Sequence, residues 1–158
     1  MKILLISDSH GNNDRMTQIL NREKPVDMVV HCGDIEGGEY LLEKTAGCPL
    51  QVVRGNNDFF TELPQELEFD VGGKHVFLTH GHYYYVSMGT EKIIEEAKSR
   101  AADIVVFGHT HRPCVAYAEN LIAVNPGSCA YPRQEGRRCS YGILDLQGEK
   151  VNVEIRYL

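Results

Sequence analysis

The sequence has no excess of basic residues. Its 16 lysines and arginines are outnumbered by 22 aspartates and glutamates, which gives a formal net charge of −6. Broad binding to nucleic acid needs a basic surface that displaces counterions, so nucleic acid is not expected as a partner. A small phosphorylated substrate is still compatible with this charge, because bound divalent cations would reverse its sign locally.

Long apolar segments and paired cysteines are also absent. The apolar run at residues 3–6 is too short for a signal peptide or for a membrane helix of about 20 residues. The five cysteines are scattered and have no CxxC spacing, which favours reduced thiols over a disulfide framework or a thiolate zinc site. They are Cys32, Cys48, Cys114, Cys129 and Cys139. We therefore expect a cytoplasmic protein that does not bind membranes.

The order of apolar patterns along the chain predicts an α/β fold. No repeat or long linker occurs, so residues 1–158 are expected to form one domain. Short apolar runs typical of buried strands lie at 2–7, 26–30, 50–54 and 104–107. Helical spacing lies at 12–21 and 91–102, with a weaker case at 39–45, and hairpin signals surround residues 72–73, 119–120 and 147–149. This pattern indicates two sheets packed face to face with helices outside.

Polar residues follow nearly every expected core strand. The five segments are Asp8-Ser9-His10, Gly33-Asp34, Gly55-Asn56-Asn57-Asp58, His80-Gly81-His82 and Gly108-His109-Thr110-His111. Because ligands of α/β sheets bind outside the carboxyl ends of strands, we expect these loops to converge at one edge. An extended backbone would point both polar side chains of Asp8-x-His10, and of His109-x-His111, the same way. Carboxylate, imidazole and amide donors without thiolate suit a catalytic site for Mn²⁺, Fe, Zn²⁺ or Ni²⁺.

The ordered set DxH, GD, GNxD, HGH and GHxH resembles the calcineurin-like metallophosphoesterase superfamily, in particular its small single-domain bacterial and archaeal phosphodiesterase branch. The match runs from Asp8 to His111, and Asn125-Pro126-Gly127-Ser128 extends it. The resemblance implies a four-layer α/β/β/α sandwich of two mixed sheets. It also implies two divalent metal ions, with Mn²⁺ favoured, held by seven residues: Asp8, His10 and His111 on the first, Asn56, His80 and His109 on the second, and Asp34 bridging both.

The resemblance and the chemistry of metal pairs together suggest a mechanism. Two cations can hold a shared water, lower its pKa and supply a hydroxide that attacks phosphorus in line, while they stabilise charge on the phosphoryl oxygens. Asp34, Asn56 and His80 would serve this chemistry as ligands. His82 is expected beside the ligands, where it could donate a proton, and Asp58 is expected to orient the asparagine loop by a hydrogen bond.

One position departs from the family pattern. Many members have a histidine directly after the ligand asparagine, where it helps to protonate the leaving group, but this sequence has Asn57. A neutral amide is a poor proton donor. The resemblance implies that members without this histidine often prefer phosphodiesters or activated esters. We therefore expect a phosphodiesterase; the alternatives are a phosphomonoesterase acting on activated esters and a non-catalytic metal-binding scaffold, the role of a eukaryotic retromer subunit of similar fold.

Several residues near the motifs keep two interpretations. Tyr83, Tyr84 and Tyr85 could wall the substrate pocket by stacking, or pack at a surface or an oligomer interface. Arg133 could clamp a phosphate, although a solvated arginine is the more common case. Association of the chain into a homo-oligomer is compatible with the sequence.

Overall fold

The computed structural model describes residues 1–158 and contains two five-stranded mixed sheets. The first sheet has the order β10-β9-β1-β2-β3 and the second the order β4-β5-β6-β8-β7. The first is built from β1 (Lys2–Ile6), β2 (Met28–His31), β3 (Leu50–Val52), β9 (Ser140–Gln147) and β10 (Lys150–Tyr157). The second is built from β4 (Glu66–Val71), β5 (Lys74–Thr79), β6 (Ile104–Val106), β7 (Cys114–Ala118) and β8 (Leu121–Asn125).

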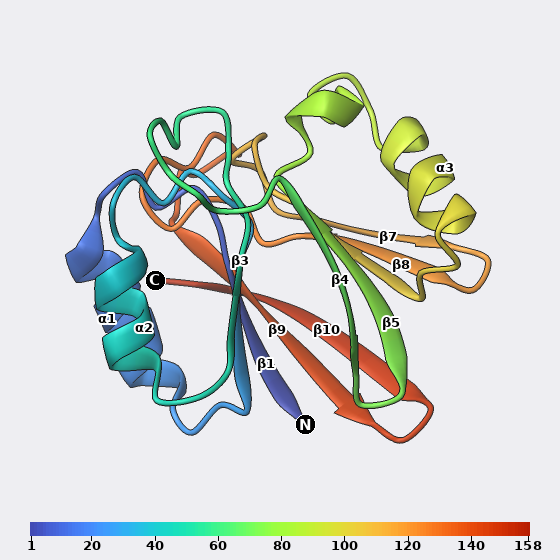
Figure 1. Ribbon diagram of the computed structural model, residues 1–158, viewed down its shortest axis with the longest axis horizontal. Helices are drawn as coiled ribbons and strands as arrows, with labels where there is room; N and C mark the ends of the chain where they lie inside the picture. Colours follow the sequence, from blue (N-terminus) through green and yellow to red (C-terminus); the bar gives the residue numbers. More distant parts are fainter.

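Helices cover the outer face of each sheet. The helices α1 (Asn13–Glu23) and α2 (Glu39–Ala46) lie on the first sheet, and α3 (Glu91–Ser99) lies on the second (Figure 1). A single turn of 3₁₀ helix, η1, spans His82–Tyr84. The result is the expected four-layer α/β/β/α sandwich. None of the three α-helices has the length and apolar composition needed to cross a membrane.

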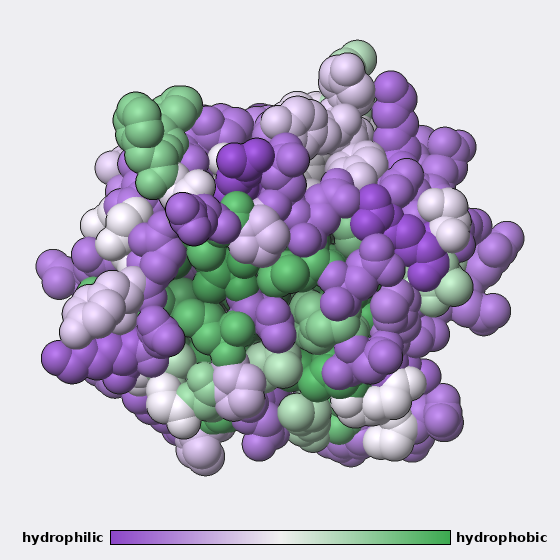
Figure 2. Space-filling view, viewed as in Figure 1, coloured by the Kyte–Doolittle hydropathy of each residue, from purple (hydrophilic) through white to green (hydrophobic).

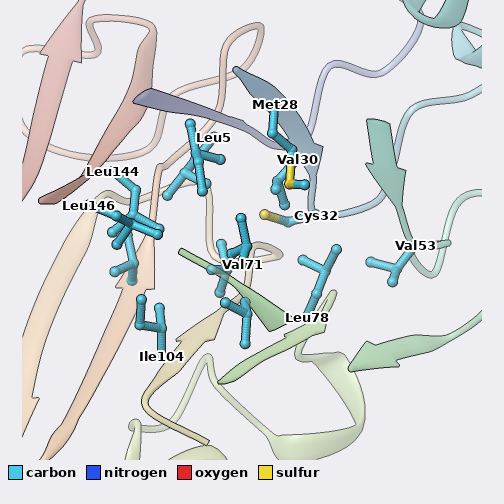
Figure 3. Packing of buried hydrophobic residues seen from close by; sticks show 14 residues of the cluster. Leu5, Met28, Val30, Cys32, Val53, Val71, Leu78, Ile104, Leu144 and Leu146 are labelled. Atoms are coloured by element: carbon cyan, nitrogen blue, oxygen red, sulfur yellow. The ribbon is translucent and has the colours of Figure 1, made fainter. Parts of the chain in front are cut away.

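Strand β1 shows why the sheets pack as they do. Its side chains alternate, so that Ile3 and Leu5 enter the core between the sheets, whereas Leu4 and Ile6 pack in the core beneath α1 and α2. Both faces are buried, which explains the continuous apolar run in the sequence. Figure 3 shows the core between the sheets, where Leu5 and Val30 from one sheet and Leu78 and Ile104 from the other point toward a shared interior.

The helices follow their sequence signals closely. Asn12 caps α1 by accepting a hydrogen bond from the Arg15 backbone N–H at 3.1 Å. The buried residues Met16, Ile19 and Leu20 have the i, i+3, i+4 spacing that was expected. The helix expected at 91–102 ends earlier, at Ser99, because Ala101 takes a left-handed conformation with φ of 53°.

The edge strands leave part of the interior visible at the surface. The strand β3 forms one edge of the first sheet, and β4 forms one edge of the second. Both strands cross the middle of the view in Figure 1. Figure 2 shows the same face with hydrophobic side chains near its middle and mostly hydrophilic ones around them. Leu67 and Phe69 of β4 are only partly buried where they pack against the core between the sheets. The apolar interior is therefore not fully covered along this edge.

A buried carboxylate joins α1 to the first sheet. Glu23 is 3% exposed and accepts a hydrogen bond of 2.6 Å from the hydroxyl of Tyr141, which is fully buried on β9. It also forms ion pairs with Arg156 of β10 at 2.6 Å and with Lys2 of β1 at 3.0 Å. One side chain thus links the last turn of α1 to three strands.

Candidate metal centre

The loops that follow β1, β2, β3, β5 and β6 meet at one end of the sandwich. Hydrogen bonds between the loops hold them together: the Asp8 N–H donates to the Gly33 carbonyl at 3.1 Å, and the Gly108 N–H donates to the His80 carbonyl at 3.1 Å. The two sheets are joined where the His109 N–H donates to Oδ2 of Asp8 at 3.1 Å. The seven side chains expected to bind metal are all brought to this place.

One group of donor atoms comes mostly from the loops that follow strands of the first sheet. The Nε2 atoms of His10 and His111 are 3.1 Å apart, and Nε2 of His111 is 3.2 Å from Oδ1 of Asp8. Together with Asp34, these residues offer four ligand atoms that all lie within 4.8 Å of one another. This grouping has the size and the donor types of a single cation site.

A second group lies beside it. Oδ1 of Asn56 is 3.1 Å from Nε2 of His80 and 2.9 Å from Nδ1 of His109. Oδ2 of Asp34 lies 3.5 Å from Nε2 of His80 and 3.8 Å from Nε2 of His10. Asp34 is therefore placed between the two groups, where one carboxylate can contact a cation in each.

The donor set fits divalent metal ions. Asp8 is fully buried, yet its Oδ1 accepts no hydrogen bond. A buried carboxylate oxygen without a hydrogen-bond donor is costly, and a cation at this point would satisfy it. The short separation of the His10 and His111 ring nitrogens also suits two lone pairs that converge on one ion.

Backbone carbonyls orient two of the histidine rings. Nδ1 of His80 lies 2.7 Å from the carbonyl oxygen of Cys32. Nδ1 of His111 lies 2.7 Å from the carbonyl oxygen of Tyr131. A carbonyl can only accept, so each Nδ1 carries a hydrogen, and in the neutral ring the lone pair of Nε2 faces the centre. This is the usual arrangement around metal-binding histidines.

The two buried carboxylates are ionised at neutral pH. Burial raises the pKa of Asp34, but the hydrogen bond and charge of His80 and the bonds from Asn57 outweigh it and lower this pKa well below its usual range. Burial also raises the pKa of Asp8, but the His111 ring against its Oδ1 and the positive charge of a protonated His80 outweigh burial and lower this pKa. Two charges this close attract a multivalent cation.

His82 lies beside the ligands but is placed differently. Its ring stands 5.3 Å from the His80 ring and 6.0 Å from the His109 ring, and its Nδ1 is buried without a hydrogen-bond partner. Burial, followed by the His80 and His109 charges, lowers the pKa of His82 to about 4. The ring is therefore mostly uncharged at neutral pH, and an uncharged imidazole has little tendency to protonate a leaving group.

Asn57 and Asp58 fasten the loop that carries Asn56. The Asn57 side-chain amide donates to Oδ2 of Asp34 at 2.7 Å, and its backbone N–H donates to Oδ1 at 2.8 Å. Asp58 accepts hydrogen bonds of 2.7 Å from the N–H groups of Gly55 and Glu36. The Asn57 amide is thus occupied by the central carboxylate, a role that the sequence did not reveal.

The backbone of the ligand loops is not extended, so the condition for alternating side chains to point the same way is not met. Asp8 and His10 have φ of 52° and 44°, and His109 and His111 have φ of 70° and 57°. Asp34 shares this left-handed conformation, with φ of 53°. Such backbone costs about 1–2 kcal/mol per residue outside glycine and often marks functional sites. The side chains converge because the chain turns sharply, rather than because alternate residues share one strand face.

Two glycines permit the close packing of these loops. A Cβ atom on Gly55 would collide with the Asp34 carboxylate, and one on Gly108 would collide with the Ser7 hydroxyl. Both positions lie beside a candidate ligand, so only glycine lets the loops approach this closely.

The mouth of the centre has aromatic side chains on both sides. Tyr83 stacks on His82 with ring centroids 4.0 Å apart, and Tyr131 meets the His10 ring edge-on at 5.4 Å. Both tyrosines are 59% exposed. Tyr84 instead points away and donates its hydroxyl to Glu66 at 2.5 Å. Tyr85 lies against Lys92, whose Nζ is 4.3 Å from its ring centroid, so that Tyr83 is the one of the three adjacent tyrosines in contact with His82.

Sequence reasoning missed two further neighbours of the centre. Glu36 lies 2.6 Å from Nδ1 of His10, and the Tyr131 carbonyl holds His111. Glu36 follows the Gly33-Asp34 motif by two residues, a proximity that could have drawn attention to it. The segment 125–128 lies beside the centre, with the Ser128 hydroxyl donating to the Asp8 carbonyl at 2.8 Å.

Comparison with known proteins reveals clear similarities. Residues 1–149 match the model of the calcineurin-like phosphoesterase superfamily domain. The probable metallophosphoesterase YsnB of Bacillus subtilis (strain 168) is 34% identical over 154 residues, which cover 97% of this chain and 89% of that protein. Phosphodiesterase YfcE of Escherichia coli (strain K12) is 30% identical over 173 residues, which cover 92% of this chain and 88% of that protein. A crystal structure of a predicted phosphoesterase from Streptococcus pneumoniae TIGR4 has a TM-score of 0.86 at 30% identity, covering 99% of this chain and 88% of that one.

Proposed function

This chain belongs to the calcineurin-like phosphoesterase superfamily, and we propose that it is a phosphodiesterase with two divalent metal ions in its centre. The observation that carries the proposal is the position of Asp34 between two groups of donor atoms. Asp8, His10 and His111 would hold one ion, and Asn56, His80 and His109 the other. Similar proteins that are named phosphodiesterases, such as YfcE, support the assignment of the reaction.

The chain's own residues arrange the reaction. When bound, the two ions supply a water of lowered pKa and positive charge for the phosphoryl oxygens. Asp34 would contact both ions, and the Cys32 and Tyr131 carbonyls keep the His80 and His111 rings aimed inward. The exposed rings of Tyr83 and Tyr131 border the mouth and can stack against the organic parts of an ester.

The lack of a proton donor favours diesters with good leaving groups. Asn57 occupies the position of the family's histidine, and its amide is bonded to Asp34. His82 is mostly uncharged at neutral pH, because its pKa is about 4. A leaving group that departs without protonation depends least on this missing help. We favour Mn²⁺ as the activating metal, while the O and N donors also accept Fe, Zn²⁺ and Ni²⁺.

The proposal is tested by hydrolysis of bis(p-nitrophenyl) phosphate and p-nitrophenyl phosphate with metal-stripped protein. Adding Mn²⁺ is expected to raise cleavage of the diester at least about a hundredfold, with the diester cleaved faster than the monoester. Preference for the monoester would contradict the role given to Asn57. No cleavage of either compound with Mn²⁺, Fe²⁺, Zn²⁺ or Ni²⁺ would favour a non-catalytic scaffold.

Replacing Asn57 with histidine is expected to raise monoester cleavage about tenfold, because an imidazole can donate the proton that the amide cannot. The measurement is kcat/KM for p-nitrophenyl phosphate at saturating Mn²⁺. Asn57→Ala is the matched control, since it also removes the bond to Asp34 but adds no donor. Equal activity of the two variants would show that the missing donor does not limit the reaction.

A further inference from the structure

A hollow of about 530 Å³ lies next to the metal centre. None of the seven proposed metal ligands lines it. It is bordered by the segment 86–90 that follows η1 and by residues around the second histidine motif. Thr110, which stands between His109 and His111, is part of its wall. Buried Val86 and Phe107 also line it, and the exposed Met88 borders it.

Two arginines without carboxylate partners line this hollow. Arg112 and Arg133 are both exposed, and no acidic residue is among the lining side chains. Nε of Arg112 donates to the Arg133 carbonyl at 3.3 Å, while the Arg133 guanidinium donates no hydrogen bond within the chain. By contrast, Arg100 and Arg156 are each held by carboxylates.

Both arginines are attached to the loop that carries the histidines. The Arg133 N–H donates to the His111 carbonyl at 3.0 Å. The Arg112 N–H donates to Oγ1 of Thr110 at 3.2 Å, and Thr110 Oγ1 also accepts from buried Asn125 at 3.0 Å. The backbone of the hollow is therefore fixed relative to the metal centre, while neither guanidinium group is paired with a carboxylate.

A second basic hollow on the molecule makes a useful contrast. It has a volume of about 570 Å³ and is lined by Lys2 and Arg156 among other cations. There Glu23 pairs with both of these cations, and Glu154 also pairs with Arg156. The wall of that hollow contains acidic as well as basic side chains, whereas the wall of the hollow beside the metal centre contains no acidic residue.

We propose that this hollow binds a second phosphate group of the substrate, together with the sugar or ring attached to it. The inference rests on the proposed phosphodiesterase function: one ester group would lie at the metals while a phosphate on the same molecule reaches Arg112 and Arg133. Planar guanidinium groups bind phosphate oxygens in pairs, and the apolar floor suits the carbon skeleton of a nucleotide-sized group. The substrate class is thus a phosphodiester that carries an additional terminal phosphate.

The first experiment compares the thymidine dinucleotide TpT with its 5′-phosphorylated form, pTpT, at saturating Mn²⁺. The wild-type kcat/KM is expected to be at least about tenfold higher for pTpT, and this ratio should fall to about one in Arg112→Ala/Arg133→Ala. Arg138→Ala, which removes an exposed arginine outside this hollow, should keep the wild-type ratio. A double variant with an unchanged ratio, or a wild type without the preference, would overturn the proposal.

A binding experiment separates this inference from the proposed reaction. Thymidine 3′,5′-bisphosphate contains no diester, and calorimetry can follow its binding to the Mn²⁺-loaded protein. Affinity is expected to fall at least about tenfold in the double variant and to persist in Arg138→Ala. If neither dinucleotide is cleaved but this loss is seen, the reaction assignment fails and the phosphate site stands. If the wild type does not bind the bisphosphate, the phosphate site is disproved.

Discussion

Replacing Asp34 with alanine is expected to lower kcat/KM for bis(p-nitrophenyl) phosphate at least about a thousandfold and to remove most bound metal. The Asp34 carboxylate lies within 4 Å of ring nitrogens in both donor groups, at 3.5 Å from His80 and 3.8 Å from His10. Without it, both donor groups would lose the carboxylate that is proposed to bridge their cations. Steady-state kinetics and measurement of bound metal test the two effects together.

A matched carboxylate distinguishes this effect from a general loss of charge. Asp70 lies on β4, has a side chain 83% exposed, and contacts His75 rather than the metal centre. Asp70→Ala is expected to keep metal content and turnover near the wild-type values. Asp34→Asn supplies a variant of nearly the same shape, so that lost activity cannot be attributed to a cavity. Full Mn²⁺-dependent turnover in Asp34→Ala would show that the metal assignment is wrong.

Replacing Glu23 with alanine is expected to lower the free energy of unfolding by about 2–3 kcal/mol. The Tyr141 hydroxyl is fully buried and would lose its acceptor. Lys2 and Arg156 have side chains 34% exposed, so water can hydrate them in part and the loss stays below that of a fully buried pair. For a chain of this size the midpoint of thermal unfolding should fall by about 5–10 °C.

Glu154 provides the control for this variant. It pairs with the same Arg156 at 2.7 Å, but its side chain is 52% exposed. Glu154→Ala is expected to cost less than about 1 kcal/mol, because exposed ion pairs contribute little. Denaturant unfolding of both variants at pH 7 measures the difference. Equal losses would mean that the burial of Glu23 does not set the strength of its contacts.

The pH dependence of stability follows from the same group. Burial raises the pKa of Glu23, but its hydrogen bonds to Tyr141 and to the two cations outweigh burial and lower the pKa below its ordinary value. A depressed pKa means that the unfolded chain binds the proton first as the pH falls. The stabilisation by Glu23 is therefore complete at pH values above the ordinary pKa of a glutamate. It is lost as the pH falls through the lower pKa that Glu23 has in the folded protein. The difference between wild type and Glu23→Ala should shrink in acid.

Much of the fold could be predicted because its signals are local. The alternation that buries both faces of β1 and the i, i+3, i+4 spacing of Met16, Ile19 and Leu20 each lie within a few residues. The same holds for the hairpin turns. The site could be located because strand ends deliver polar residues to one edge, so that a pattern of five segments indicates convergence without knowledge of the sheet order.

The remaining features depend on contacts between distant parts of the chain. The left-handed conformation of Asp8 and His10 is imposed by the neighbouring loops, and an alternating pattern alone does not indicate it. The bond from Asn57 to Asp34 spans 23 positions, and Tyr131 reaches His111 across 20. Arg112 and Arg133 come together only because residues 112 and 133 both bond to the histidine loop. Sequence patterns carry no information on such pairings.

The position of β1 in the middle of its sheet has a consequence for how the protein is made. Its residues pair on one side with β2 and on the other with β9, where Lys2 is aligned with Asp145. On the ribosome, the edge of β1 that β9 will cover stays without a partner until some 140 further residues have been added. Contacts so distant in sequence close slowly, and a strand edge left open is prone to wrong pairing. The edge of β1 that faces β9 is therefore the part of this sheet most exposed to wrong pairing during this interval.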